Sequence, residues 1–150
     1  MHLSDQTLSS LTAALTHASR VYRAAADKVA SDFGLSQATG LPVLVIHRFG
    51  ENGVRPGILA ETLSLEASSL VRVVDHLIGS GLVERHEDPQ DRRAKILRLT
   101  DEGLKTARQM DQALTPFRRR LFGEFDPADV EATLRVLSGL PTAIATIQAT

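Results

Sequence analysis

The chain has 150 residues, of which 43% are apolar and 23% charged, a balance typical of one globular domain and not of a disordered or fibrous protein. It contains no cysteine, which excludes disulfides, thiolate metal sites and sensing by thiol oxidation. The formal net charge of -1 excludes a uniformly basic coat for nucleic acid, so any such affinity must come from local clusters of Lys and Arg.

The sequence indicates a protein of the cytoplasm. No apolar run approaches the roughly 18 residues that span a bilayer. The first residues, MHLSDQTLSS, lack the basic and apolar regions of a secretory signal. We therefore predict a cytoplasmic location.

The first strong pattern is an apolar stripe near the N-terminus, which predicts one long helix. Its members are spaced by three and four residues: Leu8, Leu11, Leu15, Ala18, Tyr22, Ala25 and Val29. Such a stripe packs either inside the monomer or on a second copy of the chain, and the spacing alone leaves both open.

Three further helices are expected before the middle of the chain. Gly34 is a suitable helix stop, and Ser36 a suitable cap for a helix to about Phe49 that tolerates Pro42 or starts slightly later. After a turn at residues 50–53, Pro56 opens a short helix. A three-residue turn then leads to a helix over residues 67–80 with Gly81 as its terminator. Two helices joined in this way form a helix-turn-helix candidate.

A hairpin and two long helices complete the pattern. Residues 82–86 and 95–99 have strand-like composition, and the polar segment 87–94 (EDPQDRRA) predicts a long tip, or wing, between them. Thr100 caps a helix to about Phe122, and Asp126 with Pro127 opens the last helix. Pro141 lies inside that helix and predicts a kink or break.

A helix-turn-helix followed by a basic hairpin suits duplex DNA, because the second helix fits the major groove and a narrow loop can enter the minor groove. Ser68, Ser69 and Arg72 are exposed candidates on that helix, although Arg72 can instead pair with Asp75. In the wing, Asp91 can steady the Arg93 guanidinium, or the mixed charges can form a solvated, salt-bridged loop.

The run from Val54 to Gly103 resembles the winged-helix core of the MarR family, closest to its SlyA branch. The markers are LAETLSLEASSLVR, DHL followed by GLVER, and DPQDRRAK leading to LRLT and Gly103. The resemblance implies that Arg72 enters the major groove, that Arg93 enters the minor groove and that Asp91 steadies Arg93. It also implies DNA contacts at or near the backbone from Pro56, Ser68, Ser69, Arg85 and Arg92, to which we add Lys95 of the basic wing cluster.

The resemblance further implies a homodimer in which the first and last helices of two subunits intertwine. A two-fold dimer presents two recognition helices about one DNA turn apart, so the operator is expected to be a pseudo-palindrome. SlyA-like regulators often bind aromatic carboxylates, and Arg20 and Arg23 match positions that can face such a ligand. Gly40 and Leu44 replace an aromatic and a polar residue found in some relatives, which predicts a wider or more apolar pocket.

Two other classes of function compete with this interpretation. An enzyme is disfavoured because none of His17, His47, His76 and His86 lies in a nucleophile or metal motif. We predict no catalytic residue, cofactor or metal site, with a zinc or copper role for these histidines as the minor alternative. A winged helix that binds a protein instead of DNA is the other alternative, and the basic wing argues against it.

The sequence thus predicts a mainly α winged helix-turn-helix with a small β-hairpin, formed by one domain over residues 1–150. Residues 1–33 and 101–150 are predicted to be dimerisation helices, and residues 34–100 the DNA-binding lobe. The predicted function is a duplex-DNA-binding regulator, a repressor, that is relieved by a small aromatic or other organic ligand.

Overall fold

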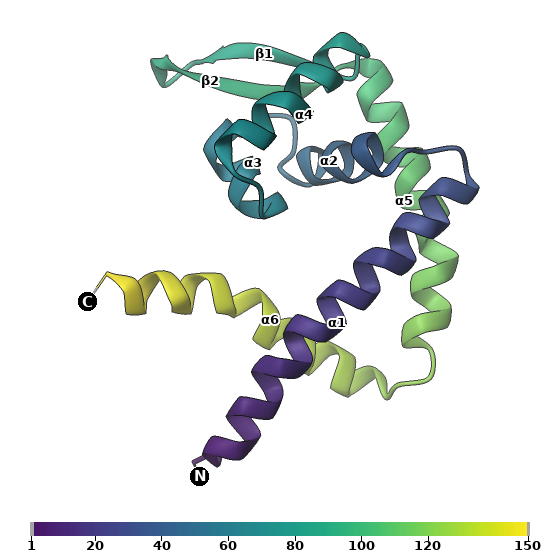
Figure 1. The fold of residues 1–150 in the computed structure, drawn as a ribbon, viewed down its shortest axis with the longest axis vertical. Coiled ribbons are helices and arrows are strands. Elements are labelled where there is room, and N and C mark those ends of the chain that lie inside the picture. Colours follow the sequence, from purple (N-terminus) through teal and green to yellow (C-terminus); the bar gives the residue numbers. More distant parts are fainter. Residues whose placement is uncertain (1, 150) are drawn as a thin grey trace. The chain divides into compact units, whose positions relative to one another are not determined.

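The computed structural model describes residues 2–149, which divide into two compact units, residues 2–114 and 115–149. The described chain is mainly helical and contains one two-stranded antiparallel hairpin (Figure 1). This arrangement confirms the predicted fold class. Within residues 2–149, none of the helices is both long and apolar enough to cross a membrane.

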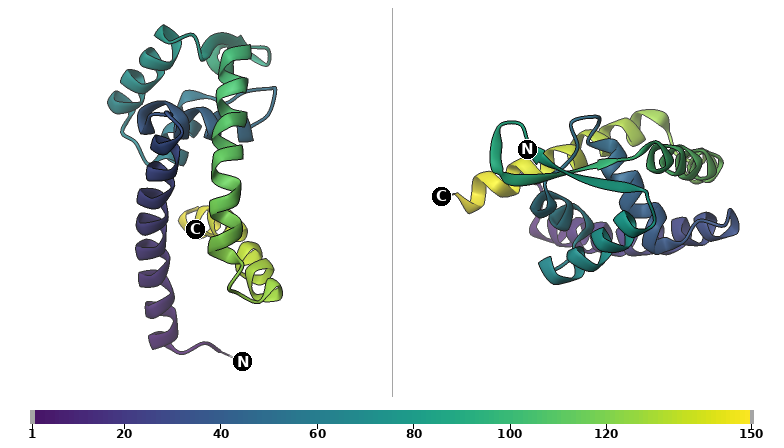
Figure 2. Two further views of the ribbon diagram at one scale, coloured as in Figure 1. Left: turned by 90° about the vertical axis from the view of Figure 1, so that its right-hand side faces the viewer. Right: turned by 90° about the horizontal axis from the view of Figure 1, so that it is seen from above.

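The N-terminal helix, α1, spans Asp5–Asp32 and is longer at both ends than its apolar stripe. It begins where the Ser4 hydroxyl accepts a hydrogen bond from the Thr7 N–H at 3.1 Å, an N-cap that satisfies a backbone donor. It ends before Gly34, whose φ of 75° lies in the left-handed region, as predicted for a helix stop. Only Ala26 and Ala30 are buried in α1, and its N-terminal part extends away from the rest of this unit (Figure 2).

The next three helices are short and pack together. Helix α2 spans Gln37–Arg48 and contains Pro42 in its first turns, so the proline is tolerated. Helix α3 spans Pro56–Leu63 with proline at its first position, and α4 spans Ala67–Gly79. Ser64 between them has a φ of 56°, the one positive value among the described non-glycine residues, and lets the chain reverse within three residues. The predicted helix-turn-helix is confirmed.

The hairpin corrects the predicted length of the wing tip. Strand β1 spans Val83–Asp88 and β2 spans Asp91–Leu99, so the connecting turn consists of residues 89 and 90 instead of the whole segment 87–94. The strands pair from Val83 opposite Leu99 to Asp88 opposite Asp91, with a register shift at Glu87/Asp88. The polar composition is misleading because most of these strand residues, Glu87 and residues 91–93 among them, face solvent and need no apolar side chains.

The two C-terminal helices begin at the predicted caps. Helix α5 spans Asp101–Phe122, and the Thr100 hydroxyl accepts a hydrogen bond from the Gly103 N–H at 3.0 Å. Helix α6 spans Pro127–Gln148, and the Asp126 carboxylate accepts one from the Ala128 N–H at 2.8 Å. Of the predicted kink or break at Pro141, the break does not occur, because α6 continues through this residue. Because α6 buries none of its described residues, the carbonyl that a proline leaves unpaired can be hydrated.

One apolar core holds α2, α3, α4, the hairpin and the start of α5 together. Its most enclosed large side chains include Val43, Ile46, Leu59, Leu77 and Leu97. The base of the hairpin is also attached to the segment before α3, because Val54 and Leu97 exchange two backbone hydrogen bonds of 3.0 and 2.8 Å. The hairpin and the helix-turn-helix are therefore parts of one lobe.

Candidate nucleic-acid interface

Helix α4 has one face in the core and one face in solvent. Leu70, Val74 and Leu77 are buried, whereas Ser68, Ser69 and Arg72 are exposed. The exposed residues lie on the first turns of the helix, where backbone N–H groups are free to meet an anion. This face can therefore offer a guanidinium, two hydroxyls and the helix N-terminus to a polyanion.

The position of Asp75 bears on the alternative that Arg72 is neutralised by an ion pair. The Asp75 Oδ1 lies 3.9 Å from Nη2 of Arg85 on β1, and both side chains are exposed. Within residues 2–149, Arg72 forms no ion pair at this distance. An exposed pair as long as that of Asp75 and Arg85 is weak, about 0–1 kcal/mol, and leaves Arg85 able to exchange it for a phosphate.

The basic residues of the wing are also accessible to solvent. Arg92 and Arg93 are exposed on β2, and Lys95 is exposed with its Nζ 3.9 Å from Oε1 of Glu87. Pro56, the first residue of α3, is only partly exposed. In Figure 1 the turn of the hairpin lies at the same end of the lobe as α3. The lobe thus carries cationic groups on both the helix and the wing.

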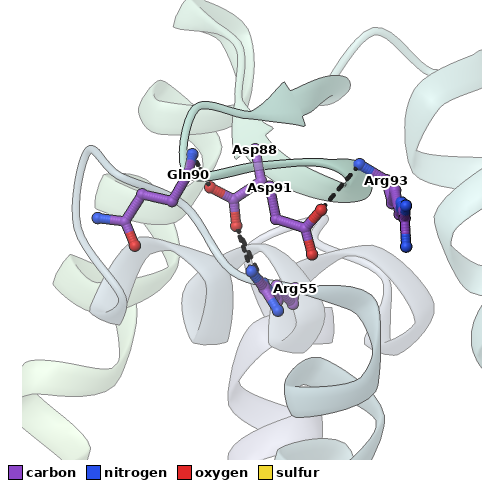
Figure 3. Close-up of polar contacts among 5 residues, drawn as sticks. All are labelled: Arg55, Asp88, Gln90, Asp91 and Arg93. Atoms are coloured by element: carbon purple, nitrogen blue, oxygen red, sulfur yellow. Dashed lines mark hydrogen bonds and ion pairs between the residues drawn. The ribbon is translucent and has the colours of Figure 1, made fainter.

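Asp91 contacts Arg93 through the backbone. Its Oδ1 accepts a hydrogen bond of 3.0 Å from the main-chain N–H of Arg93, as the dashed line in Figure 3 shows. This bond shapes the chain just after the wing turn, which is a typical action of Asp in turns. It fixes the backbone from which the Arg93 side chain departs.

The most buried acid of the lobe is Asp88, the last residue of β1, which is only 8% exposed. Its Oδ2 accepts hydrogen bonds from Nε and Nη2 of Arg55 at 3.0 and 2.7 Å, and its Oδ1 accepts one from the Gln90 N–H at 2.9 Å (Figure 3). The Gln90 hydrogen bond, followed by the bond and charge of Arg55, lowers the pKa of Asp88 below its usual value. Asp88 is therefore ionised at neutral pH.

Sequence reasoning missed both partners of this contact. Arg55 and Asp88 are 33 residues apart, and no local pattern links a residue before a helix to a residue in a hairpin. The one available signal is Asp88 before Pro89, which predicts a turn but not a partner. Arg55 and Asp88 become a pair only when the hairpin folds back towards the start of α3.

The four residues proposed to line a ligand pocket lie in two different environments. Arg20 and Arg23 are exposed on α1, whereas Gly40 and Leu44 are buried in α2. A Cβ atom added to Gly40 would lie 3.2 Å from the Met110 sulfur, so α5 packs closely there. Near this contact, a cavity of about 290 Å³ lies between the end of α1 and α5, lined by Phe33, Leu35, Gln109, Gln112 and Ala113.

Across residues 2–149, the structure contains no group of three or more His, Cys, Asp or Glu residues that could hold a metal ion. His86 has a local partner, since its Nε2 lies 3.3 Å from Oε1 of Glu84 on the same strand.

Taken together, the helix pair α3 and α4 and the short hairpin that follows it define the class of protein: a winged helix-turn-helix. Residues 34–94, which contain the helix-turn-helix and most of the wing, match the MarR family. The matched segment is somewhat less than half of the chain.

Solved structures extend the similarity over most of the chain. CouR from Rhodococcus jostii RHA1, bound to p-coumaroyl-CoA, is 28% identical, with 84% of this chain and 87% of that one covered and a TM-score of 0.71. A MarR-family transcriptional regulator from Rhodococcus sp. RHA1 is 26% identical, with 91% and 96% covered and a TM-score of 0.73. A mutant MarR from E. coli complexed with operator DNA is 20% identical over 93% and 99%, and its TM-score of 0.68 shows the shared fold.

Proposed function

We propose that this protein is a transcriptional regulator of the MarR type, in its SlyA branch, which binds a specific duplex operator in the cytoplasm. The observation that carries the proposal is the presence, on one winged-helix lobe, of an exposed Arg72 on α4 and exposed Arg92 and Arg93 on the wing. Solved relatives of the same fold include a regulator complexed with operator DNA, which supports the same interpretation.

Each basic element has a distinct part in the proposed complex. Helix α4 enters the major groove, where the Arg72 guanidinium can form two hydrogen bonds with a guanine, worth about 1–3 kcal/mol of discrimination. Arg93 enters the adjacent minor groove, whose negative potential attracts guanidinium groups. Ser68, Ser69, Pro56, Arg85, Arg92 and Lys95 lie at the backbone and set the register of the lobe on DNA.

We further propose that the protein acts as a homodimer. Large apolar side chains remain exposed on α1 and on α6, among them Leu11 at 53%, Leu134 at 64% and Ile147 at 74%. Exposed apolar side chains on two long helices are typical of a surface that another protein covers. A second copy of the chain is the occupant that a two-fold, pseudo-palindromic operator requires.

The final part of the proposal is that the regulator represses and that an aromatic ligand releases it. CouR, 28% identical, is bound to p-coumaroyl-CoA, a thioester with a phenolic ring. In this chain the cavity lined by Phe33 and Leu35 offers apolar contacts, and Gln109 and Gln112 offer hydrogen bonds. Arg20 and Arg23 on α1 can attract the negative charge of such a ligand. A ligand that prefers a dimer with the wrong spacing of its α4 helices lowers DNA affinity.

Selection of bound duplexes from a random DNA pool tests the function directly. We expect a pseudo-palindrome with half-sites about 10 base pairs apart. On the selected duplex, Arg72→Ala is expected to relax preference at one base pair per half-site, and Arg93→Ala to weaken binding and reduce the salt slope by about 1 per site. Arg108→Ala, an exposed arginine of α5, is the control and is expected to bind like the wild type. Recovery of no preferred duplex contradicts the proposal and favours a winged helix that binds protein.

The ligand is tested by titrating the bound duplex complex with p-coumaroyl-CoA, p-coumarate, salicylate and coenzyme A. Release by one of the aromatic compounds but not by coenzyme A supports the proposed ligand class. Absence of binding by all of them at millimolar concentration contradicts it. In a reporter strain, repression is supported if deletion of the protein raises transcription from the selected operator.

A further inference from the structure

An ion pair joins the turn of the wing to the beginning of the helix-turn-helix. Arg55 is the residue that precedes α3, and Asp88 is the residue that ends β1, directly before the two-residue turn. Two guanidinium nitrogens of Arg55 lie 3.0 and 2.7 Å from the same oxygen of Asp88. The other Asp88 oxygen holds the Gln90 N–H of the turn at 2.9 Å.

We propose that Arg55 and Asp88 are positioning residues, which hold the wing at a fixed place relative to α3 and α4 so that both reach DNA together. The inference rests on the proposed DNA-binding function. It gives a role in DNA binding to two residues that are outside the set predicted to contact DNA. Their action is indirect: Asp88 holds the turn, and β2, which carries Arg92 and Arg93, begins directly after the turn.

This pair differs from the other ion pairs of the lobe in geometry and burial. The contacts of Arg85 with Asp75 and of Lys95 with Glu87 are both 3.9 Å long and join exposed side chains. Asp88 is 8% exposed, and a hydrogen-bonded guanidinium is more directional and stronger than a long exposed pair. Of these three ion pairs, the one of Arg55 and Asp88 also includes a hydrogen bond from a backbone N–H of the turn, that of Gln90.

The location of the pair explains why it matters for a DNA complex. The base of the hairpin is already attached by the backbone bonds of Val54 and Leu97, but these bonds lie at the far end of β2 from the turn. Without the side-chain contact, the segment that carries Arg93 has no described ionic attachment to α3. Ordering a loose segment on binding costs affinity, so a segment held beforehand binds more tightly.

Removing the Asp88 charge should have two effects on DNA affinity, and these effects have opposite signs. A carboxylate close to DNA repels phosphates, so removing its charge should by itself strengthen binding. Removing the Asp88 charge also releases Arg55 and the turn, which should weaken binding if the pair positions the wing. Glu87→Gln removes the same charge from the neighbouring residue of β1 without touching the Arg55 contact, and it is the matched control.

The experiment measures the affinity of the full-length protein for the duplex recovered from the random pool. We expect Asp88→Asn to bind about 5- to 10-fold more weakly than the wild type, whereas Glu87→Gln binds equally well or more tightly. Arg93→Ala is expected to cost less affinity in the Asp88→Asn background than in the wild type, while Arg72→Ala costs the same in both. Equal costs of Arg93→Ala in the two backgrounds, or tighter binding by Asp88→Asn, overturn the proposal.

A second variant and a DNA-free measurement keep the test decisive if Asp88→Asn folds poorly. Arg55→Lys retains the positive charge but cannot reproduce the two-nitrogen contact, and it should weaken binding in the same direction. Amide hydrogen exchange is compared between the free Arg55→Lys variant and the free wild type. Exchange in the variant should be faster at Arg93, whose N–H does not touch Asp88, and unchanged at Val54. If the wild type binds no duplex, the proposed function fails. The exchange rates then still decide whether the pair holds the wing, and unchanged exchange at Arg93 overturns it.

Discussion

The winged-helix lobe and helix α6 use apolar side chains in opposite ways. In the lobe, Leu59, Leu77 and Leu97 have 0% exposure, and the core is closed by residues of the same unit. In α6 none of the described residues is buried, although leucine and isoleucine recur along it. The lobe therefore has the packing of a self-sufficient fold, whereas α6 presents exposed apolar side chains, which we propose that a second copy of the chain covers.

The largest expected difference is in the free energy of unfolding, when leucine is replaced by alanine in the lobe and in α6. Leu77→Ala should lower the free energy of unfolding by about 3 kcal/mol, because it leaves a cavity in a core that cannot fully collapse. Leu134→Ala removes the same atoms from a side chain that is 64% exposed and should change the stability of the lobe by less than about 0.5 kcal/mol. Urea unfolding monitored in the lobe measures both, and equal losses would contradict the comparison.

The next effect concerns the proposed dimer. Leu134→Ser together with Leu137→Ser should weaken self-association by about 2 kcal/mol or more, roughly 30-fold, because two apolar side chains lose their burial. Glu131→Ser on the same helix is the matched control and should leave the dimer intact. Sedimentation equilibrium across a range of concentrations measures the change. A double variant that associates like the wild type would show that α6 is not part of the interface.

A smaller contrast uses glycines inside the two C-terminal helices. A Cβ at Gly103 would lie 2.0 Å from the Leu82 carbonyl oxygen, so Gly103→Ala should destabilise the lobe by about 1–3 kcal/mol. A Cβ at Gly139 meets nothing within 4 Å. Gly139 follows Leu134 by five residues, which places it on roughly the opposite side of α6. Gly139→Ala should therefore stabilise by about 0.5–1 kcal/mol, since alanine favours a helix. Thermal unfolding measures both, and a loss at Gly139 would indicate a partner packed on that face.

Most of the helical framework could be predicted because helix ends carry local signals. Gly34, Pro56, Thr100 and Asp126 each mark a boundary through the conformation or hydrogen bond of that residue itself. The wing was predicted less well. Its outer strand residues are polar and exposed, so alternation between apolar and polar residues is absent and a strand resembles a loop.

The candidate site also contains a part that the sequence predicts and a part that it does not. Arg72 could be proposed because the helical spacing of the apolar residues of α4 places it on the opposite, solvent-facing side of the helix. The structure shows it exposed. The Arg55–Asp88 contact could not be predicted, since it depends on how a hairpin returns to the start of a helix 33 residues earlier. The DNA contacts, the ligand residues and the dimer remain predictions.

The smallest expected effect is the pH dependence of the Arg55–Asp88 contact. The pKa of Asp88 in the folded protein lies below its usual value of 3.8, so the ionised carboxylate stabilises the fold at pH above 3.8. This stabilisation is lost as the pH falls through the lowered pKa, because protonation weakens the hydrogen bonds from Gln90 and Arg55. The difference in unfolding free energy between wild type and Asp88→Asn should therefore be constant from neutral pH to about pH 5 and shrink in stronger acid. A wild-type advantage that persisted undiminished in acid would mean that the Asp88 charge does not hold the wing.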